Sequence, residues 1–165
     1  DYVTELFFEN LPELGHFPKE NIITYNPKKG LDKIEQYMAL LPNYTWIPLS
    51  GMTREEMRDT LRRTKLHLDF GYFPGRDKIP REALISGACL LTGRLGTSEF
   101  KEDLGIPEKY KLHDYEMQPE KVVELINHLM NNYEAFFEEF TSFRNFVMNE
   151  KQNMIECVKK LFPKP

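Results

Sequence analysis

The chain has few cysteines, no excess of positive charge and no long apolar run. Its two cysteines, Cys89 and Cys157, form no disulfide framework and match no zinc-binding spacing, which indicates a reducing compartment. The net charge of −4 argues against a nucleic-acid surface, because phosphate backbones are bound through a basic stripe. No apolar run approaches the roughly eighteen residues of a membrane-spanning helix, and no secretory leader opens the sequence. We therefore expect a cytoplasmic protein with no membrane span and no nucleic-acid partner.

The residues that are present are typical of a globular domain. The 165 residues are 41% apolar and 29% charged, and they include twelve Phe and eight Tyr. This length and composition predict a sizeable core rather than disorder. The sequence begins at Asp1 rather than at a methionine, so we expect a piece of a longer protein.

Short β-branched or aromatic runs alternate with helical patterns along the chain. Strands are expected at residues 21–25, 44–49, 65–70 and 88–92, with a short edge strand at 110–112. Helices are expected at residues 31–41, 53–63, 80–86 and 119–130, and helical patterns continue beyond residue 133. Such alternation predicts an α/β fold with a Rossmann-like, mostly parallel sheet flanked by helices.

We divide the chain into three parts on this pattern. Residues 1–20 are a connector or N-terminal arm, residues 21–132 are a Rossmann-like domain, and residues 133–165 are a C-terminal helical extension. Five Phe side chains of that extension form a stripe, which is interpreted as core packing or as packing against a partner domain: Phe136, Phe137, Phe140, Phe143 and Phe146.

The stretch from residue 66 to residue 91 reads as strand, polar loop, helix and strand. Pro80 is expected to open the helix, and Arg76, Lys78 and Arg81 add positive charge around it. Open parallel sheets bind ligands at the carboxyl ends of their strands, and a helix N-terminus offers unpaired N–H groups to an anion. The stretch indicates a site for the phosphates of a nucleotide or sugar nucleotide. The alternative interpretation is a solvated loop and helix face.

Four short motifs follow one another in an order that extends this interpretation. They are Tyr25-Asn26-Pro27-Lys28-Lys29-Gly30, Asp69-Phe70-Gly71, Pro74-Gly75-Arg76-Asp77 and Pro80-Arg81-Glu82-Ala83. Together they resemble the donor-binding, C-terminal half of GT-B fold glycosyltransferases, especially bacterial polysaccharide-type enzymes, over roughly residues 21–110. The resemblance implies one wall of a cleft that binds a nucleotide-diphosphate sugar. The other wall would be an N-terminal Rossmann-like domain that this chain lacks.

The resemblance also implies roles for single residues. Lys29 before Gly30 matches the lysine that contacts the donor diphosphate in the family. Ile23 stands where many members carry an arginine, and Lys28 or Arg76 is the candidate substitute. An ordinary turn remains the alternative for the two lysines.

A glutamate that holds ribose hydroxyls in the family corresponds to Glu82, and the alternative is a carboxylate that only complements the helix dipole. The glutamate that the family often carries eight positions earlier is replaced by Pro74, so Asp77 in the same loop becomes the candidate for contact with the sugar. Ser50 and Gly51, after the second strand, either approach the base through the backbone or form a plain turn.

The donor-diphosphate candidates are then Lys28, Lys29, Gly30, Gly75, Arg76 and Arg81. Asp69, at the end of a buried strand, needs partners for its charge, and we expect loop N–H groups, Arg76 or Arg81 to supply them. His67 is interpreted as a core or interface histidine, with a proton shuttle as the alternative. No metal and no cofactor are expected, because GT-B relatives work without a metal and the sequence has no Asp-x-Asp triplet.

The expected function is that of a glycosyltransferase donor-binding domain in polysaccharide biosynthesis, with a nucleotide sugar and a glycan or other acceptor as partners. No catalytic residue is assigned, because the catalytic base would come mostly from the missing domain, and the isolated chain is expected to be weakly active at most. The alternative is a non-catalytic nucleotide-sugar-binding or protein-interaction module with a degenerate GT-B fold, which Pro74 favours. A sugar-nucleotide epimerase or a phosphorylase-like enzyme is a further alternative, because these enzymes share the two-domain architecture.

Overall fold

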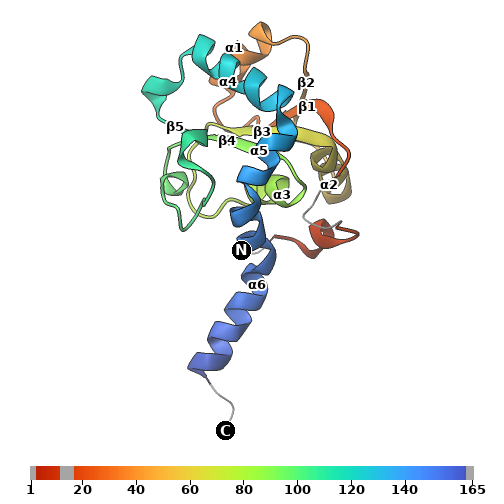
Figure 1. Cartoon of the computed structure of the whole chain (residues 1–165), viewed down its shortest axis with the longest axis vertical. Coiled ribbons are helices and arrows are strands. Elements are labelled where there is room, and N and C mark those ends of the chain that lie inside the picture. The colour runs from red at the N-terminus through yellow and green to blue at the C-terminus, as the bar shows by residue number, and fades with distance from the viewer. Residues whose placement is uncertain (1–2, 12–16, 163–165) are drawn as a thin grey trace.

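A five-stranded parallel sheet forms the centre of the computed structural model, which describes residues 3–11 and 17–162 (Figure 1). Its strand order is β2-β1-β3-β4-β5, and each neighbouring pair is parallel. The strands are β1 (Glu20–Tyr25), β2 (Thr45–Pro48), β3 (Thr64–Asp69), β4 (Cys89–Gly93) and β5 (Lys111–Leu112). The predicted Rossmann-like α/β fold is confirmed.

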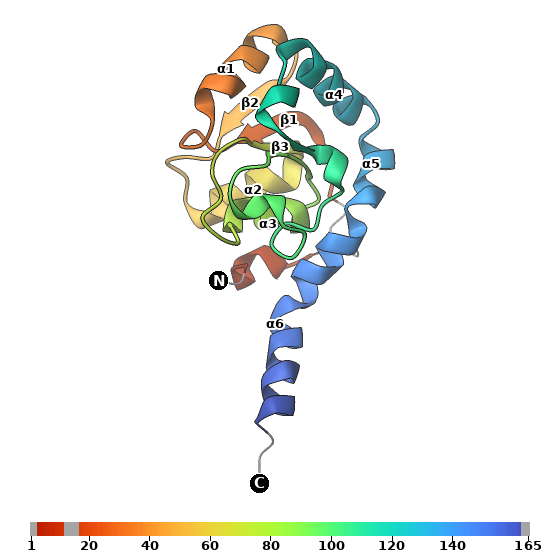
Figure 2. The ribbon, with the colours of Figure 1, turned by 90° about the vertical axis from the view of Figure 1, so that its left-hand side faces the viewer.

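Helices cover both faces of this sheet (Figure 2). The α-helices are α1 (Leu31–Leu40), α2 (Arg54–Arg63), α3 (Lys78–Ile85), α4 (Pro119–Asn131), α5 (Tyr133–Glu139) and α6 (Thr141–Leu161). The 3₁₀ turns are η1 (Glu5–Phe8), η3 (Thr97–Glu99), η4 (Glu108–Tyr110) and η5 (Asp114–Glu116). Helices α1 and α4 pack together on one face, and α2 and α3 lie together on the other (Figures 1 and 2).

Local signals in the sequence account for several element boundaries. Thr53 and Glu56 form the capping box that begins α2: the Thr53 hydroxyl accepts from the Glu56 N–H at 3.2 Å, and the Glu56 carboxylate accepts from the Thr53 N–H at 2.8 Å. Strand β2 lies at the sheet edge, where Pro48 costs no internal ladder bond. Helix α3 begins at Lys78, two residues before the predicted start at Pro80, because a proline is tolerated throughout the first turn.

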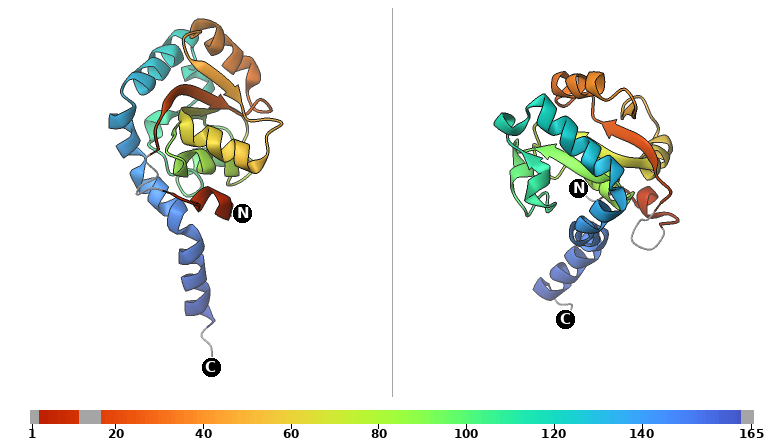
Figure 3. Two further views of the ribbon diagram at one scale, coloured as in Figure 1. Left: turned by 90° about the vertical axis from the view of Figure 1, so that its right-hand side faces the viewer. Right: turned by 45° about the horizontal axis from the view of Figure 1, so that its top comes forward.

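The C-terminal helices combine a packed part with a projecting part. Phe136, Phe137, Phe140 and Phe143 are buried in the core, as the stripe predicted, whereas its fifth member, Phe146, is 42% exposed. Beyond them α6 extends away from the body of the protein (Figures 1 and 3), and its outer end leaves apolar side chains exposed. These are Met154, Ile155, Val158, Leu161 and the following Phe162. Within the described ranges, no helix has both the length and the apolar character needed to cross a membrane.

Candidate functional site

The strand order places a topological switch point between β1 and β3. Strand β2 lies next to β1 on one flank, and β3, which follows β2 in the chain, lies next to β1 on the other flank. Ligands of open α/β sheets bind outside the carboxyl ends of the strands at such a point. Here the two loops that meet there are residues 26–30, after β1, and residues 70–77, after β3. The switch point cannot be read from the sequence, which predicts strands but not their order.

The two loops bring Lys29, Asp69 and Asp77 together. The Lys29 ammonium is ion-paired with the Asp77 carboxylate, lies 3.8 Å from Asp69 Oδ2 and sits 4.4 Å from the centroid of the Phe73 ring. A small cavity of about 170 Å³ opens beside them. Its walls are Asn26, Lys29, Asp69, Asp77, Lys78, Ile79 and Pro80.

Two glycines allow the loops to approach each other this closely. Gly30 has a φ of +66°, and a Cβ there would lie 3.0 Å from the Phe70 carbonyl carbon. A Cβ on Gly71 would lie 2.3 Å from the Lys29 Cβ. The backbones of the two loops therefore pack directly against each other. The Lys29 side chain occupies space that a side chain at position 71 would fill.

Asp69 is held at the base of this cluster. Its side chain is 1% exposed, and Oδ1 accepts the Gly71 N–H at 3.1 Å. Burial raises the pKa of the Asp69 carboxyl to about 6, although Lys29 and the Gly71 N–H both act to lower it. The predicted bond to a loop N–H is confirmed, but the nearby cation is Lys29 rather than Arg76 or Arg81.

His67 lies on β3 next to this cluster and is a core residue. Its Nδ1 is 3.1 Å from the Thr24 hydroxyl, and its ring is fully buried. Burial lowers the pKa of His67 to about 3, so the ring is neutral at physiological pH. This agrees with the core histidine that the sequence indicated.

Arg76 and Arg81 are directed toward α6 rather than toward Lys29. The Arg76 Nη1 lies 2.9 Å from Glu150 Oε1, and its Nε lies 2.8 Å from Asp103 Oδ1. The buried Arg81 guanidinium is paired with the other Glu150 oxygen. A phosphate would have to compete with these carboxylates to bind either arginine. Their contact with a diphosphate stays a prediction.

Glu82 is fully buried and ion-paired with Arg54 of α2. The Arg54 guanidinium lies 5.0 Å from the centroid of the Phe7 ring and donates to the Thr4 hydroxyl at 3.1 Å. Sequence reasoning missed Arg54, although its place in the first turn after the Ser50–Gly51 loop, near the expected ligand edge, was a usable signal. The ribose contact of Glu82 stays a prediction.

The remaining candidates lie in loops at the carboxyl ends of the strands. Lys28 is exposed, and its N–H donates to Asn26 Oδ1 at 3.0 Å in the turn after β1. The Gly75 carbonyl accepts the Thr97 hydroxyl at 2.7 Å. Ser50 and Gly51 form the exposed turn after β2, where Gly51 has a φ of +69°. Among the described residues, no group of three or more His, Cys, Asp or Glu side chains is placed to hold a metal ion.

Comparison with known proteins shows similarity in structure. No family model and no curated relative matches the chain. The crystal structure of TarM is similar with a TM-score of 0.64 and 19% sequence identity over 99% of this chain. A point mutant of S. aureus TarM in complex with fondaparinux, α-GlcNAc-glycerol and UDP is similar with a TM-score of 0.58, 20% identity and the same coverage.

The chain spans 38% of the length of the TarM chain in both comparisons. Identity at this level establishes a shared fold and leaves activity to be argued from the site. The chain therefore has the Rossmann-like fold of a region of TarM, and the Lys29 ammonium lies at its topological switch point.

Proposed function

We propose that the chain is the donor-binding domain of a glycosyltransferase and holds a nucleotide-diphosphate sugar across the loops after β1 and β3. The observation that carries the proposal is the Lys29 ammonium at the switch point of the sheet, beside the N-terminus of α3. The first N–H groups of a helix have no partner within the helix. Asp77 at the N-cap does not hydrogen-bond to them through its side chain. A lysine and a helix N-terminus facing one cavity are suited to a diphosphate.

The same groups suit the chemistry of glycosyl transfer. Negative charge develops on the departing diphosphate as the bond to the sugar breaks, and preorganised cations and N–H donors stabilise that charge. Lys29, Gly30 and the start of α3 would hold the diphosphate. The base would lie toward Ser50 and Gly51, and Glu82 would hold the ribose. No metal is needed for this arrangement.

The molecules in the TarM complex support this reaction type. UDP is what remains of a UDP-sugar after its sugar has left, and α-GlcNAc-glycerol is a sugar joined to a hydroxyl compound. These are the two kinds of product that transfer from a nucleotide sugar yields. The resemblance of the four sequence motifs to GT-B glycosyltransferases points to the same class, with a glycan or related molecule as acceptor.

A further domain would complete the enzyme. The chain corresponds to 38% of the TarM chain, and the outer end of α6 exposes apolar side chains that a second domain could cover. The catalytic base and the acceptor site would come from that domain. We therefore expect the isolated chain to bind its donor weakly and to turn over little.

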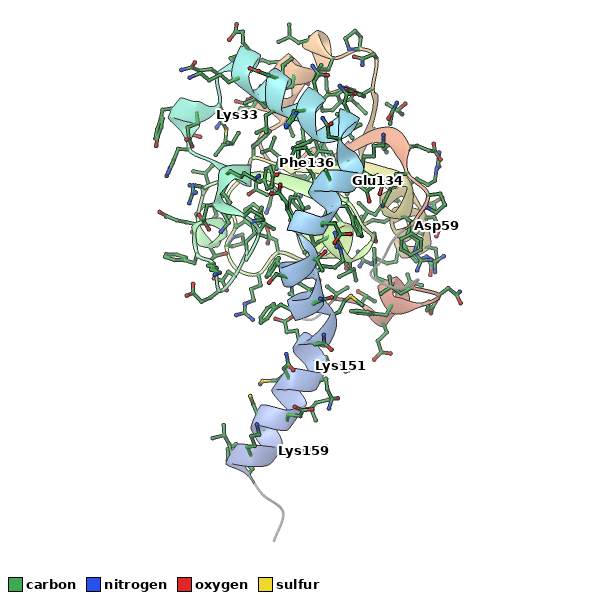
Figure 4. The ribbon with its side chains drawn as sticks, viewed as in Figure 1. Lys33, Asp59, Glu134, Phe136, Lys151 and Lys159 are labelled. Atoms are coloured by element: carbon green, nitrogen blue, oxygen red, sulfur yellow. The ribbon has the colours of Figure 1, made fainter. Side chains whose placement is uncertain are left out.

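The test is an NMR titration of the ¹⁵N-labelled chain with UDP, GDP, CMP and the matching sugar nucleotides. We expect shifts at Lys29, Gly30 and Gly71 with one base preferred, and their loss in Lys29→Ala. Lys159→Ala, at the far end of α6 (Figure 4), is the matched control and should bind as the wild type does. A spectrum that stays unchanged with every nucleotide, in the chain and in the full-length protein, contradicts the proposal.

A non-catalytic module is the second candidate. It is favoured by Pro74 in place of a glutamate and by the engagement of Arg76, Arg81 and Glu82 in ion pairs within the chain. Acceptor-dependent sugar transfer by the full-length protein would exclude it. Consumption of the nucleotide sugar without any acceptor would indicate an epimerase or hydrolase instead.

A further inference from the structure

Lys29 lies between two carboxylates that are attached to the protein in different ways. Asp69 belongs to the end of β3, and Asp77 precedes the first turn of α3. The Lys29 and Asp77 side chains are 20% and 22% exposed, whereas that of Asp69 is 1% exposed. The inner carboxylate is therefore enclosed, and the outer one borders on solvent.

The inner carboxylate is fixed in place. Asp69 Oδ1 accepts the Gly71 N–H at 3.1 Å, and Oδ2 has no hydrogen-bond partner and lies 3.8 Å from the Lys29 nitrogen. Rotation of this side chain would break the bond to Gly71 and leave a buried N–H unpaired, which is costly. Asp69 therefore stays beside Lys29 whatever binds at the cavity.

The outer carboxylate has no comparable attachment. Asp77 occupies the N-cap of α3, where an Asp side chain normally accepts the N–H of the second or third helical residue. The third residue here is Pro80, which has no N–H, and the Asp77 side chain makes no capping bond. It turns to Lys29 instead, so only rotation of a partly exposed side chain is needed to release it.

The charges around the cavity favour such a release. With both carboxylates ionised, Lys29 is more than neutralised, and Lys78 in the cavity wall only balances the remaining negative charge, so an arriving phosphate meets no net positive charge there. If the Asp77 carboxylate rotates into solvent, phosphate oxygens can take its place on Lys29 and can also reach the N–H groups of Lys78 and Ile79. The Lys29 ammonium then exchanges one anionic partner for another and is never left unpaired.

We propose that Asp77 is a replaceable counter-ion of Lys29, which a phosphate group of the ligand displaces on binding. This inference rests on the proposed function and adds a selection rule to it. Because Asp77 and Lys29 belong to the same folded chain, the Asp77 carboxylate acts on Lys29 at a high effective concentration, on the order of millimolar or above. A single weak anion does not displace it, whereas a diphosphate does, because it adds charge and contacts the α3 N-terminus. The ligand class is therefore a diphosphate ester or pyrophosphate rather than a carboxylate or a neutral sugar.

The experiment compares Asp77→Asn with the wild type for binding of UDP and of inorganic pyrophosphate, by calorimetry at one pH and salt concentration. Asparagine keeps the size of the side chain and is itself a good N-cap, so the variant should fold. Loss of the competing carboxylate should tighten both ligands about two- to fivefold, the range expected for a partly exposed ion pair. In the wild type, the Lys29 ammonium resonance should shift when either ligand is added, and acetate should leave it unchanged.

Asp114→Asn is the matched control. It also removes one carboxylate from a lysine, since Asp114 Oδ1 lies 2.7 Å from the Lys33 nitrogen, but the Lys33 side chain is not part of the cavity wall. Affinity for UDP and pyrophosphate should be unchanged in this variant. If Asp114→Asn gained as much affinity as Asp77→Asn, the effect would come from net charge alone, and the inference would be overturned.

The other outcomes separate the inference from the proposed function. Equal UDP affinities for wild type and Asp77→Asn, with shifts at Lys29 in both, overturn the displacement and leave the proposed function standing. Tighter pyrophosphate binding in Asp77→Asn without UDP binding to either protein supports the displacement and contradicts the proposed function. Absence of binding by every phosphate ligand overturns both.

Discussion

Replacement of Gly71 by alanine tests the close contact of the two loops that hold Lys29. The new Cβ would lie 2.3 Å from the Lys29 Cβ, 2.7 Å from its Cγ and 2.9 Å from its Cα. The last of these atoms is backbone, so rotation of the lysine side chain cannot relieve the contact. The loop after β1 has to move, and the ammonium moves with it away from Asp69.

The size of the effect follows from two opposing contributions. Overpacking of a buried position costs about 1 to 3 kcal/mol, and the loss of glycine flexibility in the unfolded chain returns about 0.4 to 1 kcal/mol. A net loss of about 1 to 2 kcal/mol should lower the melting temperature of a domain of this size by about 2 to 8 °C. The pKa of the Asp69 carboxyl should also rise further, because Lys29 is one of the groups that lower it.

Thermal unfolding followed by circular dichroism measures the first effect, and ¹³C NMR of the Asp69 carboxyl measures the second. Gly75→Ala is the matched control in the same loop, because no atom lies within 4 Å of the position of its Cβ and its φ is not positive. It should leave the melting temperature unchanged or slightly raised. A Gly71→Ala protein with the melting temperature and Asp69 pKa of the wild type would refute the packing described for these loops.

Three further variants test other features of the fold. The Asp69 pKa is raised from 3.8 to about 6, so the folded state binds more protons than the unfolded state between these pH values. The contribution of Asp69 to the free energy of unfolding, on the order of 2 to 3 kcal/mol, is therefore lost as the pH rises through 6. Urea titrations of Asp69→Asn should lack this loss. Glu150→Ala should cost about 3 to 5 kcal/mol in urea unfolding, because it removes a carboxylate that pairs with the buried Arg81 guanidinium. Arg144→Met should cost about 2 kcal/mol in the same assay, since the fully buried Arg144 Nε donates to the Leu84 carbonyl at 3.0 Å.

Each of these variants has its own check. His67 acts in the opposite direction to Asp69: its pKa is lowered to about 3, so its contribution to stability is lost as the pH falls below 6.5. The comparison must therefore be the difference between wild type and Asp69→Asn at each pH. Glu156→Ala, on the exposed part of α6, should change stability by less than about 0.5 kcal/mol. If Glu150→Ala changed stability as little as Glu156→Ala, the ion pair of Arg81 with Glu150 would not be stabilising. An Arg144→Met protein as stable as the wild type would show that the guanidinium bonds are dispensable.

The local features of the fold follow from neighbouring residues in the sequence. The alternation of β-branched runs with helical patterns predicted the parallel α/β sheet, and the Thr53 and Glu56 spacing predicted the capping box of α2. The Asp69 bond to a loop N–H was one of two predicted outcomes, because a buried carboxylate needs partners, and the partner found, Gly71, is two residues away. These outcomes depend on backbone geometry and on hydrogen bonds that span a few residues, so the sequence determines them.

Tertiary structure decided which charged side chains meet. Lys29 pairs with Asp77, Glu82 with Arg54, and Arg81 with Glu150 only because the strand order and helix packing bring distant segments together. The order β2-β1-β3-β4-β5, which locates the switch point, is likewise a property of the whole sheet. A charge pattern shows that partners are needed but does not identify them, because any carboxylate that packing brings within reach can satisfy a buried cation. The sequence by itself thus determined the fold class and the loops that bear charge, and packing decided which of those charges meet and where the candidate site lies.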